Sequence, residues 1–179
     1  MLDVHVIISP KTPVTWVDRC LYSLIDACVS LPYAVEVHLA PYIDGHIGHA
    51  RQHGYAMGSH PYVTTVDDDD WLEPNAFSVL RDSLQSGAPA VYTRETVWQN
   101  GKPRLFDNRQ NLRIYRRDVL NGFDFGAWPI LSDEALSRHA DGFGPGIDLP
   151  DRVYNYRINP SGSRKLYPQH ADLVRKLHG

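Results

Sequence analysis

The sequence has very few cysteines, and their spacing excludes a disulfide-stabilised scaffold. Only two of the 179 residues are cysteine. Cys20 and Cys28 stand eight positions apart in a predicted helix, too far apart to bridge within it. We therefore expect both to be small core residues of a reduced, intracellular protein.

Long apolar runs and an excess of basic charge are also missing. No run approaches the roughly 20 apolar residues that a membrane-spanning helix needs, and residues 1–10 read as a strand without the basic leader of a signal peptide. We expect a soluble, cytoplasmic protein without a membrane span. A formal net charge of −3 excludes a generally basic nucleic-acid-binding domain, though not a local basic face.

Glycine-rich phosphate loops are absent as well. Neither a Walker-type loop nor G-x-G-x-x-G occurs, which disfavours the common NTPase and dinucleotide-binding folds. The chain is 42% hydrophobic and 22% charged, a balance that suits a domain with a sizeable core. Without repeats or a linker, residues 1–179 are predicted to form a single domain.

Strands and helices are predicted to alternate through the first half. Strands are expected at 3–10, 34–44 and 61–66, and helices at 15–31, 46–58 and 73–87. Thr15 and Asp18 resemble a capping box at the start of the first helix. This order predicts an α/β fold with a mostly parallel central sheet flanked by helices.

The second half changes character. Residues 90–106 are predicted to form a hairpin that turns at Asn100-Gly101. Residues 111–120 are expected to be a strand entering a helix, and 131–140 a short helix with Ser132 as its N-cap. A last strand is predicted at the start of 151–165, before a basic C-terminal tail.

Three predicted strands end in residues that suit a ligand site. These are Ser9-Pro10, Asp44-Gly45 and the run Asp67 to Asp70. In parallel sheets, ligands bind beyond the carboxyl ends of the strands. Four adjacent carboxylates repel one another, and a hard divalent cation with oxygen ligands would relieve the repulsion. Such an ion completes its coordination shell with phosphates, which indicates a nucleoside diphosphate ligand. The alternative is that the four aspartates form an exposed acidic turn that caps the next helix.

The stretch HIGHARQHGYAMGSHPYVTTVDDDDWLEPNAF resembles the nucleotide-binding core of the family-two glycosyltransferases of the GT-A fold. The matching positions are Ala50 to Gly54, with Arg51, and Asp67 to Asp70 followed by Pro74. Three later segments, RIYRRDVL, LSDEAL and VYNYRINPSGS, resemble further motifs of that family in the same order. The resemblance implies a single GT-A-like domain, with a nucleotide-sugar-binding half at 1–88 and an acceptor-side half at 89–179.

The resemblance also implies roles on the donor side. Asp67 would contact the ribose and the metal, Asp69 would be the main ligand of Mn²⁺ or Mg²⁺, and Asp68 would assist. Asp70 is expected to cap the following helix instead. The full set expected to bind the nucleotide sugar is Ser9, Pro10, Asp44, Arg51, Asp67, Asp68 and Arg157. For Asp44, a plain Asp-Gly turn is an equal alternative.

Asp133 falls on the family's catalytic base, and its alternative role is a carboxylate stabilised by the helix dipole. Two neighbouring motifs depart from the family. Ser132 replaces a glutamate, which alters the acceptor side, and Asn159 replaces a histidine, which would make it a weaker metal ligand. Trp128 and Arg117 are the other residues expected on the acceptor side.

These observations predict a metal-dependent glycosyltransferase that uses a nucleotide-sugar donor and inverts the anomeric centre. A nucleotidyltransferase and a non-catalytic nucleotide- or sugar-binding module are the alternatives. The acceptor stays open among a glycan, a protein, a small molecule and a modified DNA base, and no oligomeric state is predicted. His46, His49 and His53 have helical spacing but no acidic partner at that spacing, so we do not expect zinc there.

Overall fold

The computed structural model describes residues 1–29, 31–43, 46–158, 172 and 175–176, with the backbone alone for 106–111. Among the described residues up to 158, seven strands and four α-helices follow one another with short 3₁₀ turns between them. In chain order they are β1 Leu2–Ile8, α1 Val14–Cys28, β2 Val35–Pro41, α2 Ile47–Tyr55, β3 Tyr62–Asp67, β4 Trp71–Leu72, η1 Ser78–Leu80, α3 Arg81–Gln85, β5 Ala90–Gln99, β6 Lys102–Arg116, η2 Arg117–Leu120, η3 Phe125–Ala127, α4 Ser132–Ala140, η4 Asp141–Phe143 and β7 Ile147–Arg157.

All seven strands belong to one sheet, in the order β2-β1-β3-β6-β5-β7-β4. The pairs β1–β2, β1–β3 and β5–β7 are parallel, whereas β3–β6, β5–β6 and β4–β7 are antiparallel. The fold class is therefore the predicted α/β domain, but the sheet is mixed rather than mostly parallel. The cause is the β5–β6 hairpin, whose second strand pairs with β3 in the middle of the sheet.

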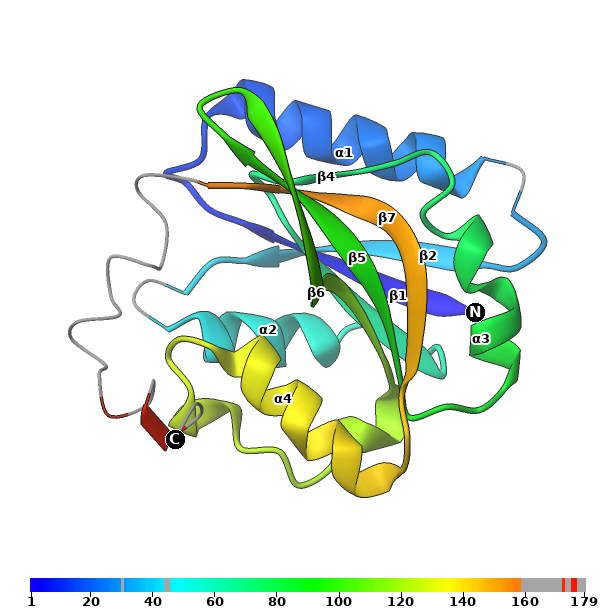
Figure 1. Cartoon of the computed structure of the whole chain (residues 1–179). Coiled ribbons are helices and arrows are strands. Elements are labelled where there is room, and N and C mark those ends of the chain that lie inside the picture. Colours follow the sequence, from blue (N-terminus) through cyan, green and yellow to red (C-terminus); the bar gives the residue numbers. More distant parts are fainter. Residues whose placement is uncertain (30, 44–45, 159–171, 173–174, 177–179) are drawn as a thin grey trace.

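The sheet lies between two helical layers (Figure 1). Side chains of β1 alternate between them: Leu2, Val4 and Val6 join the core beneath α1, together with Leu24 and Phe77. On the opposite face, α2 and α4 pack over a second core that includes Tyr55, Tyr92, Tyr115 and Leu136. The curled strands β5, β6 and β7 pass between the two layers, and β6 lies beside β3 of the first half in the sheet (Figure 1).

The local predictions for the hairpin are confirmed. The turn between β5 and β6 falls at Asn100 and Gly101, whose φ angles are 52° and 73°. Two consecutive positive φ values are what a two-residue hairpin turn of the primed type requires. The strand expected at 111–120 is also present as the end of β6, and it enters the short helix η2.

Two predicted helix starts are wrong. Helix α1 begins after Pro13 with no side-chain capping hydrogen bond, so Thr15 and Asp18 form no capping box. The helix expected from residue 73 begins only at Ser78. The amide of Glu73 donates instead to the carbonyl oxygen of Val153 at 2.9 Å, which extends the pairing with β7 and delays the helix.

Cys20 is buried, Cys28 is half-buried and both are free, as expected. Within the described part of the chain, no helix is both long enough and apolar enough to cross a bilayer.

Candidate active site

The predicted meeting of strand ends is confirmed for the described residues. In the sheet register Ile7 of β1 lies opposite Asp67 of β3, and Ile8 lies opposite Pro41 of β2. The three carboxyl ends therefore form one edge. Asp44-Gly45, the continuation of β2, lies outside the described residues, and so does Asn159.

Two of the four aspartates build the local framework. The Asp68 carboxylate accepts hydrogen bonds from the Ser9 amide at 2.6 Å and the Thr12 hydroxyl at 2.9 Å, so it shapes the loop between β1 and α1. The buried Asp70 carboxylate accepts from the Tyr154 hydroxyl at 2.7 Å and the Arg157 amide at 2.6 Å. Asp70 thus ties β7 to the edge, and its predicted role as a helix cap is wrong.

Asp67 faces a small, narrow pocket at the centre of the sheet. Side chains from both halves of the sequence line it: Arg51, Tyr55, Thr65, Asp67, Arg113, Tyr115, Asp133 and Tyr154. Strand β3 and helix α2 supply the first-half residues, and β6, α4 and β7 supply the others. The structure therefore brings together three residues predicted as functional, Arg51, Asp67 and Asp133.

Arg51 is the central group of this pocket. Its guanidinium pairs with the Asp133 carboxylate at 2.9 Å, donates to the Ser132 hydroxyl at 3.0 Å and lies 3.8 Å from the Asp67 carboxylate. Arg113 approaches the other Asp133 oxygen at 3.5 Å. Asp133 is therefore held between two arginines, rather than being only a helix-terminal carboxylate.

Ser132 is not the N-cap that the sequence predicts. Leu131 occupies that position with a φ of 58°, in the left-handed region, and Ser132 is the first residue of α4. The Ser132 side chain is fully buried and binds Arg51. A sharp turn at Leu131 thus points both Ser132 and Asp133 toward the pocket.

The two pocket carboxylates differ in their protonation behaviour. Burial would raise the pKa of Asp133, but the Arg51 and Arg113 guanidinium groups overcome it and hold that pKa well below its usual range. For Asp67, burial together with Asp69 and Asp133 outweighs Arg51 and raises the pKa to about 6. Asp133 is therefore ionised at neutral pH, while ionised Asp67 carries an electrostatic cost that a cation would relieve.

We expect Asp67→Asn to stabilise the protein at pH 8 and to lose this advantage at pH 4. Because the folded-state pKa of about 6 lies above the ordinary 3.8, the wild-type chain gains stability as pH falls from about 6 to about 4. At pH 8 the free energy of unfolding of the variant should exceed that of the wild type by about 1 kcal/mol. Solvent screening limits the difference, because the Asp67 side chain is 37% exposed. Chemical denaturation of both proteins across this pH range measures it. A variant that is less stable at pH 8 would contradict the expected cost.

The remaining predicted donor-side residues lie around the pocket rather than in it. The Arg157 guanidinium stacks 4.0 Å above the Trp16 ring and 5.1 Å from the Trp71 ring, and its charge lies near Asp69 and Asp70. Ser9 contributes its amide to Asp68, and the adjoining Pro10 is exposed in the same loop.

The residues predicted on the acceptor side lie in different parts of the structure. Ser132 contacts Arg51 in the pocket. Trp128 is half-buried against the small apolar cluster of Ile130, Leu131 and Ala135, and is not among the pocket residues. Arg117 lies elsewhere: it donates to Asp3 and to the carbonyl oxygens of Tyr55 and His60.

Sequence reasoning did not single out Tyr115 or Tyr154 as site residues, and it named Arg113 only within a basic segment that could contact a diphosphate or an anionic acceptor or form a solvated face. Arg113 and Tyr115 alternate along β6 with the buried residues Leu112 and Ile114. The available signal for Arg113 was its place between the apolar residues Leu112 and Ile114. Tyr154 gave no comparable signal, because its link to Asp70 depends on a contact across 84 positions.

The fold, one α/β domain with a curled mixed sheet flanked by helices, is similar to the GT-A-like fold of solved glycosyltransferase structures. A particular structural neighbour is TarS of S. aureus, a glycosyltransferase. Its residues 1–349 in complex with UDP-GlcNAc match 92% of this chain and 60% of that chain, with a TM-score of 0.69 at 12% identity. The complex with UDP gives a TM-score of 0.66 at 14% identity, over 89% of this chain and 61% of that one.

The chain therefore spans about 60% of these TarS structures, and 40% of a longer TarS structure. At this identity the likeness establishes the fold alone. A scan against protein-family models and a search of curated proteins found no match. Membership of family two in particular stays a prediction from the motifs.

Proposed function

We propose that the protein transfers a sugar from a nucleoside-diphosphate donor to an acceptor hydroxyl, with inversion at the anomeric carbon. The observation that carries this proposal is the position of Arg51, which pairs with Asp133 and faces Asp67 inside one pocket. The structural neighbours named above were solved with UDP and UDP-GlcNAc. A uridine-diphosphate sugar is therefore the first donor to test.

The residues at the edge fit a divalent metal ion. Asp67 and Asp69 supply hard oxygen ligands, and the raised pKa of Asp67 marks an electrostatic cost that a cation would relieve. The described residues bring no three carboxylate, histidine or cysteine ligands together here. Mn²⁺ or Mg²⁺ would accordingly be held by one or two carboxylates together with donor phosphates and water. When bound, the ion would stabilise negative charge on the departing diphosphate.

Asp133 is the proposed general base. Its carboxylate is ionised and partly exposed in the pocket, with a side-chain exposure of 27%, so it can accept the proton of an acceptor hydroxyl. The two arginines weaken it as a base in the free protein. A donor diphosphate would compete for the Arg51 guanidinium, and partial release of the ion pair would raise the pKa of Asp133. Donor binding would thereby activate the base.

Two alternative functions predict different products. A nucleotidyltransferase would release inorganic pyrophosphate from a nucleoside triphosphate, and a binding module would release nothing. The pairing of Asp133 with two arginines supports neither alternative. A binding module needs no ionised base, and a nucleotidyltransferase needs no carboxylate opposite the leaving group.

The test is metal-dependent release of nucleoside diphosphate from a panel of nucleotide sugars, measured with Mn²⁺ and with Mg²⁺. We expect release from at least one uridine-diphosphate sugar, accelerated by the acceptor and lost in Asp69→Ala. The matched control is Asp82→Ala, an exposed aspartate remote from the pocket. Binding of nucleotide sugar without turnover, or release of pyrophosphate alone, would overturn the proposal.

A further inference from the structure

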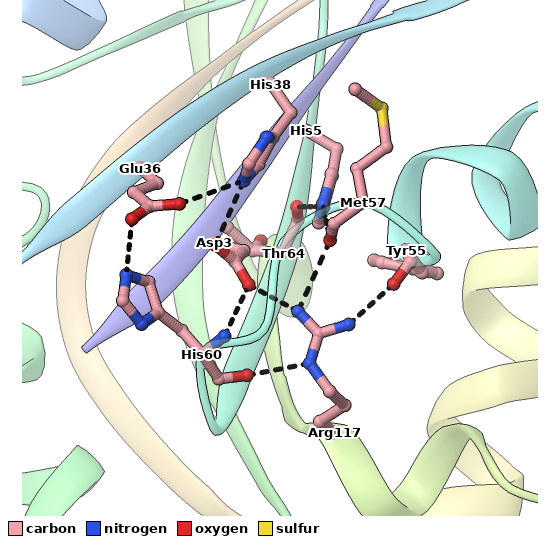
Figure 2. A network of polar contacts seen from close by, with 9 residues as sticks. All are labelled: Asp3, His5, Glu36, His38, Tyr55, Met57, His60, Thr64 and Arg117. Carbon is pink, nitrogen blue, oxygen red and sulfur yellow. Dashed lines mark hydrogen bonds and ion pairs between the residues drawn. The ribbon is translucent and has the colours of Figure 1, made fainter.

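A second polar cluster (Figure 2) lies toward the other end of β1 and β3 from the candidate active site. It joins Asp3 of β1, Glu36 and His38 of β2, and His60, which precedes β3. Asp3 pairs with Val63 in the β1–β3 register, whereas Asp67 pairs with Ile7. Four residues of extended strand, about 13 Å, therefore separate the two places.

Four side chains converge in this cluster. The His38 Nε2 atom lies 3.0 Å from Asp3 Oδ1 and 3.8 Å from one Glu36 oxygen. The His60 Nε2 atom lies 3.4 Å from the other Glu36 oxygen. One ligand atom each from Asp3, Glu36 and His60 lies within 4.8 Å of the others.

We propose that Asp3, Glu36 and His60, with His38 beside Asp3 as a further ligand, bind a divalent transition-metal ion of the zinc class. Two imidazoles and two carboxylates are a ligand set that Zn²⁺ accepts, and tetrahedral bonds of about 2.1 Å place neighbouring ligand atoms about 3.4 Å apart. The His38–Asp3 separation of 3.0 Å and the His60–Glu36 separation of 3.4 Å lie near that value, whereas the ligand atoms of Asp3, Glu36 and His60 are spread over as much as 4.8 Å. Small side-chain adjustments at the half-exposed Glu36 would bring the ligand atoms into place.

His60 supplies a second, independent indication. Its Nε2 atom is buried and has no hydrogen-bond partner among the described residues, although it faces the Glu36 carboxylate. A buried ring nitrogen without a partner carries a cost that a metal bond would remove. His5 is different, because both its ring nitrogens face carbonyl oxygens, of Thr64 at 3.1 Å and Met57 at 3.2 Å, so it is no ligand.

The groups behind the proposed ligands orient them. Asp3 is fully buried, and its Oδ2 atom accepts from the His60 amide at 2.8 Å and from Arg117. Its Oδ1 atom is left facing His38, on the side of the proposed ion. Arg117 is fixed in turn by the carbonyl oxygens of His60 and Tyr55. Such supporting contacts hold a ligating carboxylate in one orientation.

Such an ion would join β1, the edge strand β2 and the segment before β3. The proposed ligands are not among the residues that line the pocket, so the ion would have a structural role rather than a catalytic one. The competing explanation is a plain ion-pair network in which a protonated histidine balances the two carboxylates.

Titration of the metal-free protein with Zn²⁺, measured by calorimetry, tests the proposal. Co²⁺ provides a second readout, because its visible absorption bands report tetrahedral nitrogen and oxygen ligands. We expect one ion per chain at this cluster, with affinity at least tenfold weaker in Glu36→Gln and in His60→Ala. Glu36 is 57% exposed, so its replacement should leave the fold intact.

Two variants serve as matched controls. The stacked rings of His46 and His49 lie outside this cluster, so the double variant His46→Ala/His49→Ala should keep the cobalt spectrum of the wild type. Asp69→Ala should keep it too, which separates this test from the proposed function. The proposal is overturned if Zn²⁺ does not bind, if Glu36→Gln and His60→Ala bind as the wild type does, or if either control abolishes binding.

Discussion

Asp133→Asn is expected to lower kcat for sugar transfer by about 10³-fold, with little change in the affinity for the nucleotide sugar. Asparagine keeps the size of the side chain but cannot accept the acceptor's proton. Donor affinity should persist because Arg51 keeps its place beside Asp67 and Ser132. The measurement is kcat with a competent donor and acceptor, alongside calorimetric donor binding to the variant.

The control for this prediction is Glu134→Gln, a change of the same kind one residue further along the first turn of α4. It should keep kcat within about threefold, since Glu134 is not among the pocket residues. If Asp133→Asn retains more than about a tenth of wild-type kcat, a general-base role is ruled out. If both donor binding and kcat vanish together, Asp133 shapes the donor site instead.

Arg51→Met is expected to lower the free energy of unfolding by about 3 kcal/mol near pH 8. Arg51 is only 8% exposed. Its loss leaves the Asp133 and Asp67 carboxylates in one pocket with Arg113 as the remaining nearby arginine. Methionine keeps most of the aliphatic part of the side chain, so the loss of stability is due mainly to the missing charge.

The difference between Arg51→Met and the wild type should narrow as pH falls from 8 to 5. In the wild type, the lowered pKa of Asp133 stabilises the fold at pH values above the ordinary pKa of an aspartate. That stabilisation is lost only in stronger acid. In the variant that pKa rises, so protonation near pH 5 relieves the uncompensated charge. Denaturant titrations at both pH values measure the difference.

Arg81→Met provides the comparison, because Arg81 is 56% exposed and pairs with Asp82 at 3.0 Å on the surface. Its effect should stay below about 0.5 kcal/mol at either pH. An Arg51→Met variant as stable as Arg81→Met, or a difference that widens in acid, would show that Arg51 does not balance the pocket carboxylates.

The Asp67 to Asp70 run shows how far local sequence reaches. Its place after a buried strand and beside a second strand end followed from periodicity, and both are confirmed. The role of each aspartate within the run did not follow from periodicity, because adjacent aspartates look alike in sequence. Asp70 turns to Tyr154 and the Arg157 amide, and Asp68 turns to Ser9 and Thr12. Each choice depends on partners brought close by the sheet.

The start of α4 shows the same limit. The sequence placed a helix at 131–140 and a carboxylate in its first turn, and both are present. Ser132 was expected to cap that helix, since serine is a favourable N-cap. The left-handed Leu131 and the buried Arg51 redirected its hydroxyl. A tertiary hydrogen bond to a guanidinium here outweighs a local capping preference.

The sequence by itself determined the alternation of strands and helices, the hairpin turn and the edge at which the carboxylates gather, because these depend on periodicity and local backbone preference. Only the tertiary structure decided that the sheet is mixed, that Arg113 and Tyr154 belong to the pocket, and that Asp133 lies between two arginines. Those outcomes depend on strand order and on contacts between residues up to 87 positions apart. No local pattern carries that information.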